Sequence, residues 1–130
     1  MSGKLFLLDT NIVIALFADE YDVVNNISRA ESVFIPAIVI GELFYGAELS
    51  THREKNIRKL EEFSSACRIL NCDYETAKFY AQVKSFLKKS GNPVPENDVW
   101  IAGLAIQCEL PLVTRDRHFD NIKKLKVIKW

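Results

Sequence analysis

Leu5-Phe6-Leu7-Leu8-Asp9-Thr10-Asn11 lies near the start of this 130-residue chain and decides its fold. Its four apolar residues form a short continuous run, which is typical of a parallel strand covered on both faces of a sheet. Asp, Thr and Asn are helix-capping residues, and the apolar segment 12–17 follows them. The stretch therefore predicts a buried strand that leads into a helix, with an acid at the junction.

The same alternation of strand and helix continues along the chain. A β-rich run over 32–35 is closed by Pro36, a residue favoured at the first helical position, and a helix is predicted over 38–49. Later segments predict a helix after the capping-box pattern Thr51-x-x-Glu54, a longer helix capped by Asp73, an apolar helix over 99–108, a strand over 112–114 and an edge strand over 126–130. We therefore expect an α/β fold, one domain over residues 1–130, with a mainly parallel central β-sheet flanked by α-helices.

The composition agrees with one globular domain. Apolar residues make up 48% of the chain and charged residues 26%, with 17 basic side chains against 17 acidic ones. No apolar run approaches the roughly 20 residues that a membrane span needs, so we expect a cytoplasmic protein with no membrane contact. The three cysteines form no C-x-x-C pair, and zinc-site spacing is absent.

Four acids occupy positions where parallel sheets form ligand sites. Asp9 directly follows the first strand, Asp116 follows the strand over 112–114, and Asp98 opens the helix that precedes that strand. Glu42 lies in an apolar helical stretch, so its carboxylate needs water, a partner or a ligand. Taken singly, each acid has a structural explanation as a helix cap, a turn residue or a surface residue.

Taken together, the four acids predict a metal site. Carboxylates that converge on one end of a sheet repel one another unless a cation neutralises them. Hard oxygen ligands select Mg²⁺ or Mn²⁺, ions that commonly act on phosphate esters. Competing chemistries lack sequence support, because G-x-S-x-G, G-x-G-x-x-G and the P-loop pattern are all absent.

Four segments of the chain resemble the signature segments of PIN-domain ribonucleases, in order and in spacing. They are Leu7-Leu8-Asp9-Thr10-Asn11, Ile40-Gly41-Glu42-Leu43-Phe44-Tyr45-Gly46-Ala47, Asn97-Asp98-Val99-Trp100-Ile101-Ala102 and Leu112-Val113-Thr114-Arg115-Asp116. The most similar subgroup is the VapC-type toxins of toxin–antitoxin pairs. The resemblance implies that the acidic quartet Asp9, Glu42, Asp98 and Asp116 binds Mg²⁺ or Mn²⁺ for catalysis, with Thr10, Asn11 and Thr114 as supporting polar residues.

The resemblance also implies partners. Members of this subgroup cleave structured RNA, form homodimers and pair with an antitoxin protein. Basic residues near the end of the chain are candidates for holding an RNA backbone beside the acids: Arg115, Arg117, Lys123 and Lys124. Two alternatives stay open, a regulatory binding module that holds its antitoxin on operator DNA with little cleavage, and a PIN nuclease that processes RNA without being a toxin.

Overall fold

The computed structural model describes residues 3–130, so the first two residues of the expected domain lie outside the described part. In chain order the elements are β1 (Leu5–Leu8), α1 (Thr10–Phe17), α2 (Tyr21–Arg29), β2 (Ser32–Pro36), α3 (Ala37–Glu48), α4 (Arg53–Ser65), β3 (Arg68–Leu70), α5 (Tyr74–Ser90), α6 (Glu96–Cys108), β4 (Leu112–Val113), the 3-10 helix η1 (Arg117–Phe119) and β5 (Val127–Ile128). Within residues 3–130, no helix is both long enough and apolar enough to cross a membrane.

A five-stranded sheet in the order β3-β2-β1-β4-β5 forms the centre of the molecule. Every neighbouring pair of strands is parallel, and Leu7 of β1 stands opposite Phe34 of β2 on one side and Leu112 of β4 on the other. Leu7 and Leu8 are fully buried, as a continuous apolar run in a doubly covered strand requires. The expected α/β class and parallel sheet are confirmed.

The strand order creates a switch point beside β1. The chain moves from β1 outward to β2 and β3, and later returns to the other side of β1 to form β4 and β5. Crevices at the carboxyl ends of strands that flank such a point are the usual ligand sites of open α/β sheets. Asp9 follows β1 and Thr114 follows β4, so both lie at this crevice.

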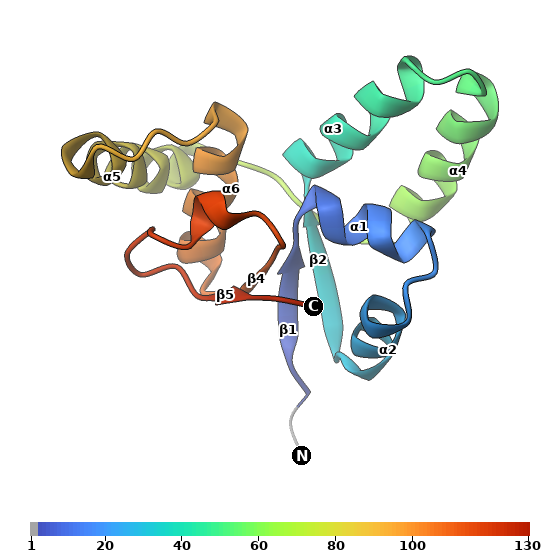
Figure 1. Cartoon of the computed structure of the whole chain (residues 1–130), viewed down its shortest axis with the longest axis horizontal. Coiled ribbons are helices and arrows are strands. Elements are labelled where there is room, and N and C mark those ends of the chain that lie inside the picture. Colours follow the sequence, from blue (N-terminus) through green and yellow to red (C-terminus); the bar gives the residue numbers. More distant parts are fainter. Residues whose placement is uncertain (1–2) are drawn as a thin grey trace.

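The helices form two groups on either side of the central strands (Figure 1). α5 packs against α6, and α3 packs against α4, while α1 contacts both α2 and α3. Both groups contribute polar side chains to the crevice. Glu42 comes from α3 in one group, and Asp98 comes from α6 in the other. The site is therefore assembled from segments that are far apart in the sequence.

Several local expectations were wrong. α2 and β3 were not predicted. α2 has only nine residues, of which Val23 alone is fully buried, and β3 is a three-residue edge strand that is largely exposed, so both apolar patterns are short. The capping box at Thr51-x-x-Glu54 does not form, because α4 begins at Arg53 after His52, which makes no side-chain cap hydrogen bond. The expected cap at Asp73 is confirmed as a reciprocal capping box with Thr76.

Two helix starts also differ from expectation. Pro36 ends β2 and precedes α3, whose first residue is Ala37. α6 begins at Glu96 after Pro95, so Asp98 is the third residue of the helix and not its cap. Asp98 is therefore not a helix cap, and the burial of its carboxylate needs another explanation.

The contact between α5 and α6 leaves no room for a side chain at Gly103. A Cβ at this position would lie 2.9 Å from the backbone nitrogen of Tyr80 and 3.2 Å from its Cα. We expect Gly103→Ala to push the two helices apart and to lower the free energy of unfolding by about 1–3 kcal/mol. The matched control is Gly46→Ala in α3, where nothing lies within 4 Å. Chemical denaturation should show the control unchanged or stabilised by up to about 1 kcal/mol; equal effects in both variants would contradict the close approach.

Candidate metal centre

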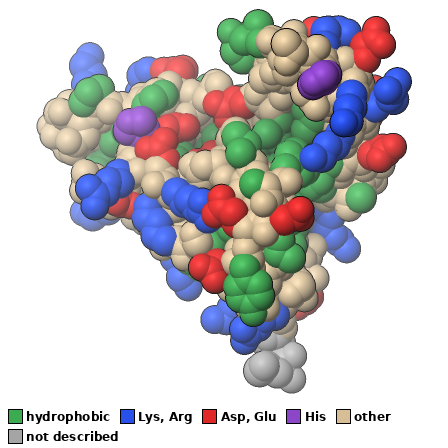
Figure 2. Space-filling view, turned by 45° about the vertical axis from the view of Figure 1, so that its right-hand side comes forward, with side chains coloured by type: hydrophobic (Ala, Val, Ile, Leu, Met, Phe, Trp, Pro, Cys, Tyr) green, Lys and Arg blue, Asp and Glu red, His purple; other side chains and the backbone are tan. Residues whose placement is uncertain are grey.

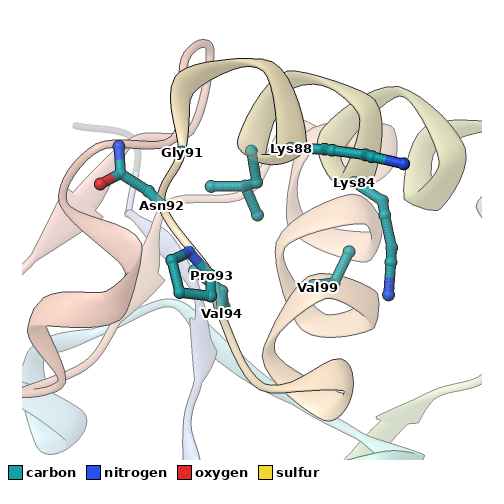
Figure 3. A pocket seen from close by; sticks show the side chains of 8 residues that line it. Lys84, Lys88, Gly91, Asn92, Pro93, Val94 and Val99 are labelled. Carbon is teal, nitrogen blue, oxygen red and sulfur yellow. The ribbon is translucent and has the colours of Figure 1, made fainter.

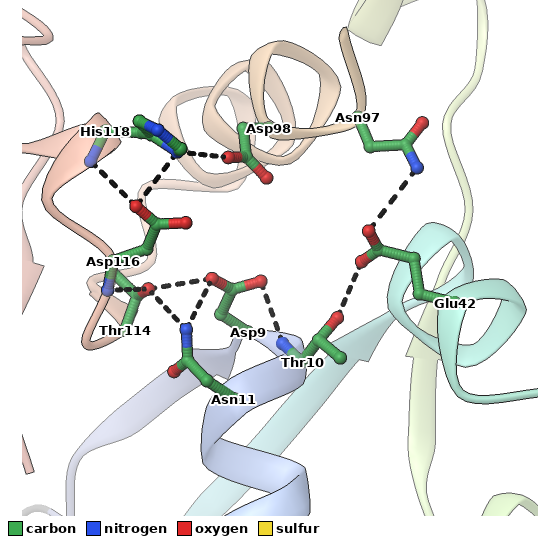
Figure 4. A network of polar contacts seen from close by, with 9 residues as sticks. All are labelled: Asp9, Thr10, Asn11, Glu42, Asn97, Asp98, Thr114, Asp116 and His118. Atoms are coloured by element: carbon green, nitrogen blue, oxygen red, sulfur yellow. Dashed lines mark hydrogen bonds and ion pairs between the residues drawn. The ribbon is translucent and has the colours of Figure 1, made fainter. Parts of the chain in front are cut away.

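All four candidate acids project into one space at the carboxyl ends of β1 and β4 (Figure 4). Asp9 is the residue that caps α1, Asp116 caps η1, Asp98 comes from the first turn of α6, and Glu42 comes from the middle of α3. Asp9 and Asp98 are only 4% and 8% exposed. The capping explanation holds for Asp9 and Asp116, yet capping alone does not account for the meeting of four carboxylates.

Hydrogen bonds hold Asp9 in a single orientation. Its Oδ1 accepts from the backbone N–H of Thr10 at 2.8 Å, and its Oδ2 accepts from the Thr114 hydroxyl at 2.7 Å. The Asn11 amide lies 3.4 Å from the same Oδ2 and 3.3 Å from the Thr114 oxygen. The Thr114 hydroxyl also accepts from the backbone N–H of Asp116, so it connects two of the acids.

Glu42 is oriented from two different elements. Its Oε1 accepts from the Thr10 hydroxyl at 2.6 Å, and its Oε2 accepts from the Asn97 amide at 3.4 Å. Thr10 therefore touches Asp9 through its backbone and Glu42 through its side chain. Thr10, Asn11 and Thr114 all contact the carboxylates, in the places where the sequence suggested supporting residues.

His118 is a member of the site that sequence reasoning missed. Its Nδ1 lies 2.9 Å from Asp116 Oδ1 and 3.3 Å from Asp98 Oδ2, and its backbone N–H donates to the same Asp116 oxygen. In the sequence, the only indication of a role for His118 is that it lies two residues after Asp116. The contact with Asp98 joins residues 20 positions apart and arises from the packing of η1 against α6.

Burial and mutual repulsion disfavour the ionised acids. The pKa of Asp98 is raised to about 6, first by burial and then by the charges of Asp9 and Asp116, while the His118 hydrogen bond opposes this shift. The pKa of Asp9 is also raised, chiefly by burial, although hydrogen bonds from Thr114 and Thr10 lower it. The folded protein thus holds more negative charge here than its own side chains neutralise.

The donor set fits a hard divalent cation. Among residues 3–130, no Lys or Arg forms an ion pair with any of the four acids, and only the His118 ring faces two of them. One ligand atom each from Asp98, Asp116 and His118 lies within 4.8 Å of the others. Carboxylate oxygens in such a group match the ligands that Mg²⁺ and Mn²⁺ prefer.

The basic candidates near the end of the chain lie in different settings. The Arg115 guanidinium donates to Glu20 at 2.8 Å and to the Trp130 carbonyl oxygen at 3.0 Å. Arg117 is exposed within η1. Lys123 and Lys124 are exposed and border a pocket beside α5. Arg115 is therefore held by contacts within the chain, whereas the other three side chains are open to solvent.

A separate pocket lies between α5, the loop after it and α6 (Figure 3). It has a volume of about 370 Å³ and is lined by Lys84, Leu87, Lys88, Gly91, Asn92, Pro93, Val94 and Val99. None of the four acids lines it, and its walls are mostly apolar. Its composition does not suit the chemistry that the carboxylates indicate.

Thr114 is expected to contribute both to stability and to the charge state of Asp9. Its hydroxyl is fully buried and makes contacts with Asp9, Asn11 and Asp116. We expect the nearly isosteric Thr114→Val to lower the free energy of unfolding by about 2–3 kcal/mol, because a buried charged acceptor loses its donor. The pKa of Asp9 should rise further, which carboxyl NMR titration measures. Thr114→Ser keeps the hydroxyl and should leave the Asp9 pKa unchanged; a shift as large as that of Thr114→Val would contradict this role.

A family model and curated proteins match nearly the whole chain. The model of the PIN domain matches residues 6–125. Ribonuclease VapC2 of Haemophilus influenzae is 33% identical over 128 residues, which cover 96% of this chain and 97% of that protein. The tRNA(fMet)-specific endonuclease VapC of Salmonella typhimurium is 33% identical over 131 residues, with coverage of 96% and 97%.

Solved structures share the fold closely. VapBC2 from Rickettsia felis, bound to a DNA fragment from its promoter, superposes with a TM-score of 0.89 at 29% identity and covers 97% of this chain and 98% of its own. DNA-bound VapBC from Salmonella typhimurium gives a TM-score of 0.87 at 30% identity, with 99% of both chains covered. The fold is thus common to these proteins and to this chain.

Proposed function

The chain belongs to the PIN-domain family, and from this premise we propose that it is a VapC-type endoribonuclease that hydrolyses phosphodiester bonds of structured RNA with Mg²⁺ or Mn²⁺. Relatives that are 33% identical carry the names of VapC ribonucleases. The observation that carries the proposal is the convergence of four carboxylates, two of them buried, without a Lys or Arg partner among residues 3–130. The proposed metal ligands and catalytic residues are Asp9, Glu42, Asp98 and Asp116.

Each residue of the network has a distinct proposed task. Bound cations supply positive charge for the phosphate and lower the pKa of a bound water. Asp9, at the junction of β1 and α1, and Asp98 of α6 would hold the ions, and Thr114 and Asn11 keep Asp9 turned toward the shared space. Because the carboxylates are oriented before any ligand arrives, little free energy is spent on ordering them.

The surface around the acids carries basic side chains that suit the binding of a polyanion. Figure 2 shows acidic side chains beside a histidine at the left of the view, with Lys and Arg side chains below that histidine and a second row of Lys and Arg side chains at the upper right. Arg117, Lys123 and Lys124 are exposed and are proposed to contact the RNA backbone, together with Arg115 once it leaves Glu20. An RNA loop with unstacked bases can enter such a site, whereas an RNA double helix cannot.

We further propose that the protein acts in the cytoplasm as a homodimer, as the toxin of a toxin–antitoxin pair. Two of the structural neighbours described above are VapBC complexes bound to DNA. This observation favours a second activity of the same protein, in which toxin and antitoxin together occupy an operator. The four acids are all present, which supports cleavage as the primary activity.

The proposal is tested by cleavage of a pool of structured RNAs. The purified protein, free of antitoxin, is incubated with Mg²⁺, with Mn²⁺ and with EDTA, and the products are sequenced. We expect cuts at discrete sites that require a metal ion. Glu42→Gln protein, purified identically, detects contaminating nuclease because its side chain keeps the shape but not the charge of Glu42.

Two outcomes would decide against the proposal. Equal cleavage by the wild type and the Glu42→Gln variant would assign the activity to a contaminant. Absence of cleavage by a folded, metal-bound wild type would favour the regulatory binding module. If discrete cleavage is seen, a test of whether expression arrests growth, and whether a short neighbouring gene relieves it, separates a toxin from an RNA-processing nuclease.

A further inference from the structure

We propose that His118 is a direct metal ligand, which makes one half of the centre a mixed nitrogen and oxygen site that prefers Mn²⁺ to Mg²⁺. This inference rests on the proposed metal-dependent function and goes beyond the four carboxylates. His118 lies in η1, and its side chain is 47% exposed, so the ring is accessible from solvent. His118 makes no hydrogen bond to Asp9 or Glu42, which are oriented by other polar residues.

The position of the ring nitrogen is the first argument. His118 Nδ1 lies 2.9 Å from Asp116 Oδ1 and 3.3 Å from Asp98 Oδ2. Two ligand atoms that occupy adjacent corners of an octahedral ion, with bonds of about 2.1 Å, are separated by about 3.0 Å. The spacing of the nitrogen from both oxygens therefore matches a cation bound by all three atoms. Figure 4 shows the His118 ring facing both carboxylates.

The hydrogen-bonding capacity of the ring is the second argument. Nδ1 carries at most one hydrogen, yet two carboxylate oxygens face it. One proton cannot make a good hydrogen bond to both oxygens, whereas a divalent ion can bind all three atoms. The backbone N–H of His118 already donates to Asp116, so the ring is not needed to hold that carboxylate.

The nature of the ligand leads to the metal preference. Mg²⁺ takes oxygen ligands and keeps several waters, so it gains little from an imidazole. Transition-metal ions accept imidazole nitrogen more readily. A site made of His118 with Asp98 and Asp116 should therefore discriminate in favour of Mn²⁺, whereas a site of carboxylates alone should discriminate less.

Pulsed electron paramagnetic resonance of bound Mn²⁺ tests the ligand directly, without reference to activity. The full chain is stripped of metal and titrated with Mn²⁺ at pH 8. We expect ¹⁴N modulation of the Mn²⁺ signal, and a ¹⁵N-type pattern when only the histidines are labelled. The chain has two histidines, so His52→Gln, at the exposed start of α4, is the matched control and should keep the modulation.

Variants at His118 give the second readout. His118→Ala should abolish the nitrogen modulation and weaken Mn²⁺ binding about tenfold or more, while Mg²⁺ affinity changes less than about threefold. His118→Asn retains a polar group near the Nδ1 position and should also lose the modulation. Circular dichroism confirms that the variants are folded.

The possible results separate this inference from the proposed function. Mn²⁺ that binds to the wild type without nitrogen modulation, or with modulation that persists in His118→Ala, would overturn the ligand role and leave the carboxylate centre intact. Failure of the wild type to bind either ion would overturn both proposals. Equal losses of Mn²⁺ and Mg²⁺ affinity in His118→Ala would overturn the metal preference.

Discussion

Asp9→Asn is expected to lower the rate of metal-dependent RNA cleavage by about 10³-fold or more, equivalent to about 4 kcal/mol of transition-state stabilisation. Asp9 is the most buried of the four acids at 4% exposure, and three donors orient it toward the shared space. Replacement by Asn removes the negative charge that a cation needs but leaves the side chain almost the same size.

The fold should survive this change. Asp9 caps α1, and Asn is about as good a helix cap as Asp. Loss of activity in Asp9→Asn would therefore reflect lost charge and not a lost helix. Single-turnover cleavage at one mapped RNA site, with saturating Mg²⁺ or Mn²⁺, measures the effect.

Asp73→Asn is the matched control for Asp9→Asn. Asp73 is also the cap of a helix, α5, and also accepts hydrogen bonds from a threonine. The same chemical change there should leave cleavage within about twofold of the wild type, because Asp73 is not among the residues of the candidate centre. If Asp9→Asn retained cleavage within tenfold of the wild type, Asp9 could not be an essential metal ligand.

Asp98→Asn is expected to have opposite effects on stability and on metal binding. The pKa of Asp98 is raised to about 6 in the folded protein, whereas the unfolded chain has a value near 3.9. A raised pKa means that ionisation of Asp98 opposes folding, so stability contributed by this group is full below about pH 4 and is lost as pH rises through about 6. At pH 7.5, the metal-free variant should be more stable than the wild type by up to about 2 kcal/mol.

The pH dependence identifies the cause of this difference. At pH 4 both proteins carry a neutral side chain at position 98, so the advantage of Asp98→Asn should shrink toward zero. Saturating Mn²⁺ should raise the melting temperature of the wild type and have a much smaller effect on the variant, because binding to the folded state alone stabilises a protein. Thermal and chemical denaturation in EDTA and in Mn²⁺, between pH 4 and 7.5, provide the measurement.

Asp120→Asn is the control for Asp98→Asn. Asp120 is an exposed acid just beyond η1 that pairs with Lys129. Removing its charge should change stability by less than about 0.5 kcal/mol and leave the response to Mn²⁺ intact. A metal-free Asp98→Asn protein that is less stable than the wild type, with an unchanged response to Mn²⁺, would show that Asp98 has only a structural role.

Local sequence patterns were sufficient for the sheet centre and for the strand-to-helix junction at Asp9. The apolar run over 5–8 indicates a strand covered on both faces, which holds for Phe6, Leu7 and Leu8, and the capping residues after it mark where the backbone turns. The same reasoning located the cap of α5 at Asp73, and the helix ends before Gly91, whose positive φ of 72° suits glycine. These features depend only on neighbouring residues.

Weakly patterned elements escaped prediction for a physical reason. β3 has three residues, and only its pairing with β2 makes it a strand. α2 has nine residues, and only Val23 and Ile27, spaced by one helical turn, pack into the core, so its apolar face is too short to stand out among the polar residues around it. The sequence places the start of α6 too late, because residues 96–98 are polar and follow a loop with two prolines, whereas the helix begins directly after Pro95.

The sequence by itself determined the α/β class, the parallel sheet around β1 and the identity of the four candidate acids, three of them at or near the ends of elements and Glu42 within an apolar helix, since burial patterns and capping chemistry are local. Only the tertiary structure decided which atoms meet. The contacts of Thr114 with Asp9 and of His118 with Asp98 join residues separated by 105 and 20 positions. Such contacts arise when β4 pairs beside β1 and η1 packs on α6, which is a consequence of global packing and leaves no periodic signal in the chain.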